Sequence, residues 1–151
     1  MTAAKTIEQQ RAETALEAVR NVAGRANDVQ RMYASYAKSL PAMILMAGLG
    51  QALATAMSKG AGSASGGNAE AWRLLVGHLE DWLVRRCPES PYRGAAPPET
   101  GDGPAGLALM RAIVDHDQRA YVIAQAEALA YLQWLKKFAN ALLAREAGDG
   151  G

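Results

Sequence analysis

Apolar residues recur at every third or fourth position along most of this chain, which is the spacing of one face of an α-helix. The resulting stripes predict helices near Thr6–Ser39, Ala42–Ser58, Asn68–Arg86, Ala105–Val114 and Asp117–Arg145. No segment alternates apolar and polar residues as a half-buried strand would. The pattern therefore predicts an all-α fold, a single-domain bundle of about five helices over residues 1–151.

Residues with known helix-end preferences mark the predicted boundaries. Thr6, Asn68 and Asp117 each precede an apolar stripe and are good N-cap residues, because their side-chain oxygens accept free amide hydrogens of the first turn. Gly24 lies inside the first stripe and predicts a kink or break there. Pro41 is expected to end the first helix or to open the second, since proline has no N–H to offer a helix interior.

Three segments lack helical periodicity. Residues 59–67 are rich in glycine and serine and predict a flexible linker, because they bury too little side chain to offset the entropy of ordering. Residues 88–104 hold five of the six prolines and predict a surface loop. Residues 147–151 are mostly glycine and are expected to fray.

The stretch between Lys38 and Lys59 carries no charge, which raises the question of a membrane span. It contains Pro41, two glycines and several hydroxyl side chains, so a buried central helix is the better interpretation. The segment from Met1 to Arg11 is polar and charged, so a secretory signal is not expected.

Composition limits the classes of function. The chain has 16 basic and 15 acidic residues, so it lacks the strong positive field of a stand-alone nucleic-acid binder, and any RNA contact must come from a local patch. Cys87 is the single cysteine, which excludes internal disulfides and suits the reducing cytoplasm.

One motif carries a resemblance to a known family. It includes Tyr33, Tyr36, Lys38, Leu40, Pro41, Met43 and Ile44 and continues through Gly48-Leu49-Gly50-Gln51. Weaker parts of the same pattern surround Trp82 and, between Tyr121 and Ala139, Trp134. Together they resemble the small-subunit family of the type III-B CRISPR RNA-targeting (Cmr) complex. Ala47 departs from the pattern, since the family often has a polar residue there.

The resemblance implies a small helical protein, present in several copies, that stacks into a filament beside the other subunits of a Cmr complex. It would help to line the channel for guide RNA and target RNA in antiviral defence. The resemblance also implies a non-catalytic role with no cofactor, no membrane and no small-molecule substrate.

Physical chemistry gives the Gly-Leu-Gly-Gln motif its own interpretation. Glycines are unfavourable inside a helix unless another group must approach closely, so Gly48 and Gly50 predict a packing notch filled by a tyrosine or tryptophan of the core. A phosphate-binding glycine loop is the alternative, but it needs a strand before the glycines, and the preceding residues have a helical pattern.

Basic residues supply the candidate RNA contacts. If the first helix is continuous, Arg20, Arg31 and Lys38 form one line on its outer face, opposite the apolar stripe. An ordinary solvated face is the alternative, and the resemblance favours contact with RNA phosphates. Lys136 and Lys137 are second candidates, although the last turns of a helix favour cations in any case.

No catalytic or metal site is predicted. His78, His116 and Cys87 are far apart in sequence, and zinc needs three or four convergent ligands. The charged residues also lack the clustered spacing of a nuclease. A helical adaptor that binds a partner protein and has no link to CRISPR remains the alternative function.

Overall fold

The computed structural model describes residues 4–61, 66–95 and 103–145. Their elements are α1 (Ile7–Ala23), α2 (Asn27–Ala47), α3 (Leu49–Gly60), α4 (Gly67–Glu80), the π-helix η1 (Asp81–Arg86), α5 (Leu107–Asp115) and α6 (Gln118–Leu142). These described residues form no strand. The predicted all-α, single-domain fold is confirmed, with more helices than the five expected.

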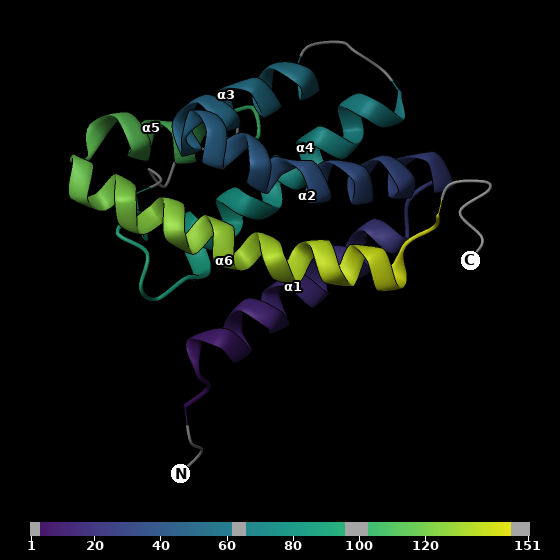
Figure 1. Ribbon diagram of the computed structural model, residues 1–151, viewed down its shortest axis with the longest axis horizontal. Coiled ribbons are helices and arrows are strands. Elements are labelled where there is room, and N and C mark those ends of the chain that lie inside the picture. The colour runs from purple at the N-terminus through teal and green to yellow at the C-terminus, as the bar shows by residue number, and fades with distance from the viewer. Residues whose placement is uncertain (1–3, 62–65, 96–102, 146–151) are drawn as a thin grey trace.

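The longest helix, α6, organises the bundle. It packs against α1 on one side and against α2 on the other, and α4 packs against both α2 and α3. Figure 1 shows α2 and α6 side by side along the long axis of the molecule, with α3 and α5 at one end. The α2–α6 pair therefore forms one long face of the bundle.

The apolar stripes of the sequence predict a core packed through seven large side chains, and all of them are buried: Tyr33, Ile44, Leu53, Trp72, Trp82, Leu132 and Leu135. Helical periodicity alone was sufficient to identify them.

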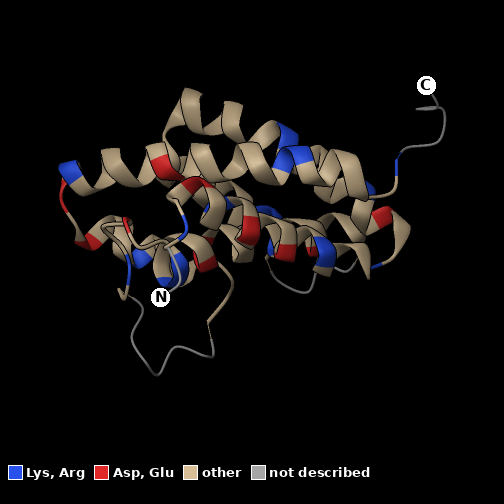
Figure 2. Ribbon diagram, turned by 90° about the horizontal axis from the view of Figure 1, so that it is seen from below, with Lys and Arg blue, Asp and Glu red and all other residues tan. Residues whose placement is uncertain are grey.

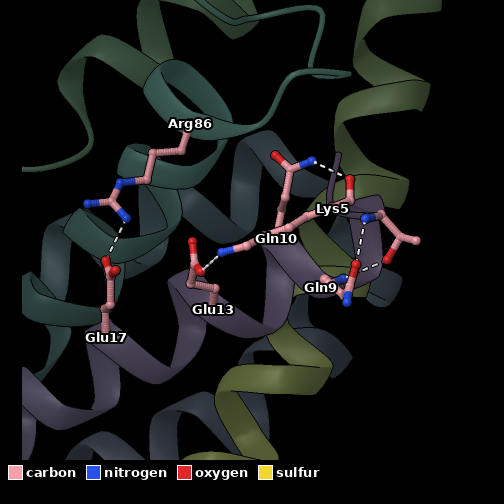
Figure 3. Close-up of polar contacts among 7 residues, drawn as sticks. Lys5, Gln9, Gln10, Glu13, Glu17 and Arg86 are labelled. Atoms are coloured by element: carbon pink, nitrogen blue, oxygen red, sulfur yellow. Dashed lines mark hydrogen bonds and ion pairs between the residues drawn. The ribbon is translucent and has the colours of Figure 1, made fainter. Parts of the chain in front are cut away.

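The prediction of one continuous helix over Thr6–Ser39 is wrong and the break predicted at Gly24 is confirmed, because α1 ends at Ala23 and α2 begins at Asn27. Thr6 caps α1 as expected, in a capping box with Gln9 (Figure 3). The last helical residue of α1 directly precedes Gly24, whose amide donates to carbonyls of the last turn of α1.

The second predicted boundary, at Pro41, is also wrong. Pro41 lies inside α2, and the chain breaks instead at Gly48, which has a φ of 89°. Such a positive φ suits glycine and is unfavourable for residues with a Cβ. The missing N–H of one proline therefore weakens α2 without ending it.

Two further boundaries differ from the prediction. Asn68 does not cap α4, whose N-cap is Gly66; its Oδ1 accepts the hydroxyl of Tyr36 at 2.7 Å instead. Asp117 does cap α6, accepting the amide of Ala120 at 2.9 Å. In the predicted linker, Lys59 and Gly60 belong to α3, and residues 62–65 lie outside the described residues.

The predicted surface loop is partly wrong. Ser90 and Tyr92 are buried, and Tyr92 belongs to the core, so residues 88–95 cover part of the bundle. The apolar content of this segment is a single large side chain, which gives no periodic signal. Residues 96–102 and the predicted fraying tail, 147–151, lie outside the described residues. Within the described part, no helix is long and apolar enough to cross a membrane.

Candidate functional site

Two hydrogen bonds fix how α2 and α6 lie against each other. At one end of the pair, the Leu49 amide donates to Oε1 of Gln125 at 2.9 Å. At the other end, the Ala144 amide donates to Oε1 of Gln30 at 2.9 Å. Leu49 opens α3 directly after α2, and Ala144 follows the end of α6. The end of α2 therefore lies near the first half of α6 and the start of α2 lies near its C-terminal end, so the two helices run antiparallel.

A groove of about 230 Å³ opens between α2 and the C-terminal end of α6. Its lining residues are Arg31, Ala34, Ser35, Lys38, Ala139, Asn140, Leu143, Ala144 and Arg145. Lys136 precedes Asn140 by one turn on α6, so it lies on the same side of that helix, just beyond the lining residues. We call Arg31, Lys38 and Lys136 the groove cations. Figure 2 shows blue segments near the C-terminal end of the chain, where this groove lies.

The groove cations have no acidic partner among the described residues. The ion pairs of that part of the chain use Lys5, Arg11, Arg25, Arg85 and Arg86. Figure 3 shows two of these ion pairs, from Arg86 to Glu17 and from Lys5 to Glu13. Both glutamates lie on α1. The acidic side chains of α1 therefore neutralise other cations and leave the groove positive.

The predicted line of Arg20, Arg31 and Lys38 does not exist as a single helical face. Arg20 lies on α1, exposed and outside the groove, because the helix breaks after Ala23. Arg31 and Lys38 share α2 and line the groove together. Lys136 is half-buried on α6, one turn before Asn140 of the groove.

Sequence reasoning missed two residues that line the groove, and one of its candidates, Lys137, lies outside the groove. Asn140 lies one turn after Lys136 on α6, so helical spacing could have found it. Arg145 was predicted as the last residue of the helix over Asp117–Arg145, but α6 ends at Leu142, so helical spacing does not place Arg145 in the groove. Lys137 is exposed and does not line the groove, since it points about 100° away from Lys136.

The glycine motif forms the elbow between α2 and α3. Gly48 joins the two helices, and Gly50 lies in the first turn of α3, where its amide donates to the hydroxyl of Tyr121 at 2.9 Å. A Cβ on Gly48 would lie 2.7 Å from that same hydroxyl oxygen. The predicted notch is therefore present and is filled by Tyr121, but Gly48 lies between helices rather than inside one.

The contacts of the elbow also bear on the phosphate-binding alternative. The amides of Leu49 and Gly50 are the free donors of a new helix, and they are already bonded to Gln125 and Tyr121 of α6. Leu49 itself is buried, whereas Gln51 is exposed. The elbow fixes α3 against α6 and offers no open cradle of amides.

The aromatic motif residues lie in the interior. Tyr36 stacks on Trp72 with ring centroids 4.1 Å apart, and the Tyr33 hydroxyl lies 2.8 Å from Nδ1 of His78. Trp134, half-buried on α6, lies against Phe138. Tyr33 and Tyr36 therefore join α2 to α4, whereas Trp134 and Phe138 contact each other within α6.

A second surface feature lies at the other end of the α2–α6 pair. Leu45 is 70% exposed, Met46 is 89% exposed and Val122 of α6 is 60% exposed. Leu45 lies about two turns after Lys38 and therefore on the same side of α2. On α6, Val122 and Leu129 line a shallow, largely apolar hollow of about 270 Å³ with Tyr121. We call Leu45, Met46, Val122 and Leu129 the apolar patch.

The histidine and cysteine of the interior are arranged for packing. Burial lowers the pKa of His78 to about 4, with a smaller contribution from the charge of Arg25, so its ring is neutral near pH 7. Burial raises the pKa of the Cys87 thiol to about 11, which disfavours the nucleophilic thiolate. Among the described residues, no three His, Cys, Asp or Glu side chains come together as a metal site.

Comparison with known proteins supports the resemblance noted in the sequence. The family model described as CRISPR-associated protein (Cas_Cmr5) matches residues 7–142. The crystal structure of a CRISPR-associated Cmr5 family protein from Thermus thermophilus is also similar, with a TM-score of 0.66 and 27% sequence identity. The match covers 92% of this chain and 98% of that one. With its family model matched from the first turn of α1 to the last residue of α6, the chain belongs to the CRISPR-associated Cmr5 family.

Proposed function

We propose that this chain is a non-catalytic small subunit of a type III-B Cmr effector ribonucleoprotein, acting in the cytoplasm. Copies of the chain would stack into a filament beside the other Cmr subunits and line the channel for guide and target RNA. Membership of the Cmr5 family supports the place in a Cmr complex.

The groove cations are the observation that carries the RNA-binding part of the proposal. They lie along two adjacent helices with no acidic partner among the described residues, around a groove that also contains the amide of Asn140. Isolated basic side chains along a helix face contact phosphates and set position without reading bases. A subunit repeated along an RNA of any sequence needs contacts of this kind.

The apolar patch supports contacts with copies of itself or with other subunits. Leu45 and Met46 are consecutive, highly exposed side chains in the last turn of α2, and Val122 is exposed in the first half of the adjacent α6. Contiguous exposed apolar surface is unfavourable in water and commonly marks a protein interface. It lies at the opposite end of the α2–α6 pair from the groove, so both could be used at once.

The chemistry of the buried groups supports a non-catalytic role. His78 is held neutral beside Tyr33, and Cys87 is buried with a raised pKa, so neither is activated as a base or nucleophile. Both buried acids of the described residues have structural partners. Glu127 accepts hydrogen bonds from Arg11 and Trp82, and Glu80 accepts the Leu109 amide and pairs with Arg85.

The test is target-RNA capture by a reconstituted Cmr complex that carries Arg31→Glu, Lys38→Glu and Lys136→Glu in this subunit. Losing three phosphate contacts should weaken capture by about tenfold or more at near-physiological salt, while assembly and helix content stay intact. The matched control reverses Arg93, Arg111 and Arg119, which are exposed, lie outside the groove and have no acidic partner among the described residues.

Two outcomes separate the parts of this proposal. Equal capture by the groove variant and the wild type, in fully assembled complexes, would remove the RNA role and leave the scaffold role. Failure of the wild-type chain to join a Cmr complex would favour the helical adaptor instead.

A further inference from the structure

A buried glutamine joins three segments at the end of the groove. Gln30, in the first turn of α2, is only 8% exposed. Its Nε2 donates to the carbonyl oxygens of Ala23 at 3.1 Å and Arg25 at 2.8 Å, and its Oε1 accepts the Ala144 amide. One side chain therefore holds the end of α1, the α1–α2 connection and the exit of α6.

Only an amide side chain suits this place. The carbonyl of Ala23, at the end of α1, has no partner further along the helix and needs a donor. The Ala144 amide, just past α6, needs an acceptor. Glutamine offers two donors and an acceptor without charge, whereas glutamate would turn a carboxylate toward two carbonyl oxygens.

The contact with Ala144 fixes where the chain goes after α6. The helix ends at Leu142, and the extended Leu143 is buried against the core. The next residue is held by Gln30, so the chain has two successive anchors immediately before Arg145. Arg145 then lines the groove together with Arg31 and Lys38.

Without these anchors the backbone just before Arg145 would not be fixed, and the Arg145 side chain would sample more positions. Ordering a flexible cationic side chain on a ligand opposes binding through lost entropy. A residue held in place before the ligand arrives loses less freedom, so its contact contributes more to affinity.

We infer that Arg145 is a further phosphate-contacting residue of the RNA groove and that Gln30 is the residue that positions it. This inference rests on the proposed function, because it concerns the same groove. It adds Arg145, which lies outside every helix, to the RNA contacts. It also implies that Gln30, a buried neutral side chain that does not touch RNA, affects RNA affinity.

The test is a double-mutant cycle in the reconstituted complex, with target-RNA capture measured for Gln30→Ala, Arg145→Gln and both together. Arg145→Gln should weaken capture by about threefold to tenfold and should reduce the dependence of log affinity on log salt by about one. Gln30→Ala should weaken capture in the wild-type background and have little further effect once Arg145 is replaced.

Two further variants separate positioning from loss of stability. Val29→Ala shortens the neighbouring buried side chain of α2 and leaves the Gln30 contacts in place, so it should destabilise the subunit without changing RNA capture. If Gln30→Ala fails to assemble, Gln30→Met takes its place in the cycle. Methionine keeps most of the side-chain volume but has no amide, so it should weaken capture as predicted for the alanine variant.

Independent, additive effects of Gln30 and Arg145 would overturn the positioning role. An Arg145→Gln variant that captures RNA normally, while reversal of Arg31, Lys38 and Lys136 abolishes capture, would overturn the inference and leave the proposed function standing. If reversal of those three residues has no effect either, the proposed RNA role itself fails.

Discussion

The indole N–H of Trp82 donates to Oε2 of Glu127 at 3.0 Å inside the bundle. Glu127 also accepts two hydrogen bonds from Arg11 of α1, at 2.6 and 2.8 Å, and these raise the pKa of the arginine further above its usual range. The Trp82 ring stacks on Tyr131 with centroids 5.2 Å apart. One tryptophan thus connects η1, α6 and, through a buried carboxylate, α1.

We expect Trp82→Ala to lower the free energy of unfolding by about 3–5 kcal/mol, the usual scale for removing a large buried aromatic side chain. Trp82→Phe should cost about 1–2 kcal/mol, because it keeps a ring on Tyr131 and removes one hydrogen bond to a charged acceptor. Denaturant unfolding of the three proteins provides the comparison. A Trp82→Ala variant as stable as wild type would show that this face is not core.

We expect the subunit to lose stability on mild acidification through His78. The pKa of the folded-state ring is about 4, against an ordinary 6.5, so between these values the unfolded chain binds a proton that the folded chain does not. The contribution is fully present above about pH 6.5 and is lost as the pH falls toward 4. The loss should reach about 1–3 kcal/mol.

Carboxylates also titrate in the lower part of that range, so the comparison needs a variant without the imidazole. His78→Gln keeps a polar group near the Tyr33 hydroxyl and should show a smaller drop in unfolding free energy between about pH 7.5 and pH 5. An equal drop in both proteins would assign the effect to other groups. Direct NMR titration of the ring would then give a value near 6.5.

The two elbow glycines should respond differently to alanine. Gly48→Ala forces a Cβ into a positive φ of 89° and to within 2.7 Å of the Tyr121 hydroxyl oxygen, and we expect it to cost about 2 kcal/mol or more. At Gly50 the nearest heavy atom to an added Cβ is 3.6 Å away, an ordinary contact, and the backbone is helical. Gly50→Ala should therefore be neutral or slightly stabilising. Similar losses from both changes would contradict this account of the elbow.

The sequence predicted the core well because Trp72, Trp82 and Leu132 lie on stripes whose period depends on local geometry alone. It misplaced the breaks because Pro41 and Gly48 compete locally, and the outcome depends on Tyr121 and Gln125. Those two residues come from α6, far along the chain. No local pattern contains that information.

The candidate site was predictable in the same way: local spacing could be predicted from the sequence, whereas contacts between distant segments could not. Arg31 and Lys38 share one helix, so their common face could be predicted from helical spacing. Lys136 was predicted as a second candidate for RNA contact, but its place near the groove depends on the packing of α6 against α2. Arg145 was predicted as the last residue of a helix, whereas α6 ends at Leu142 and the hydrogen bond from Ala144 to Gln30 fixes the chain just before Arg145.

The apolar patch should be required for association with other subunits and not for folding. Leu45 and Met46 are 70% and 89% exposed, so replacing both with glutamine removes little buried area and should leave the free energy of unfolding within about 0.5 kcal/mol of wild type. Val122→Gln on α6 should act in the same way, since Val122 belongs to the same patch. All three changes together should lower self-association in sedimentation experiments and incorporation into a Cmr complex.

A control for general surface effects is Leu142→Gln, since Leu142 is also an exposed apolar residue but lies at the other end of α6. Interface energy is concentrated in a few central apolar side chains, so the patch variant should fail where the Leu142 variant succeeds. The groove cations are unchanged in the patch variant. Its RNA capture should therefore fall only in proportion to the amount of subunit that is lost from the complex. A patch variant that assembles as wild type does would show that another face of the bundle holds the neighbouring subunits.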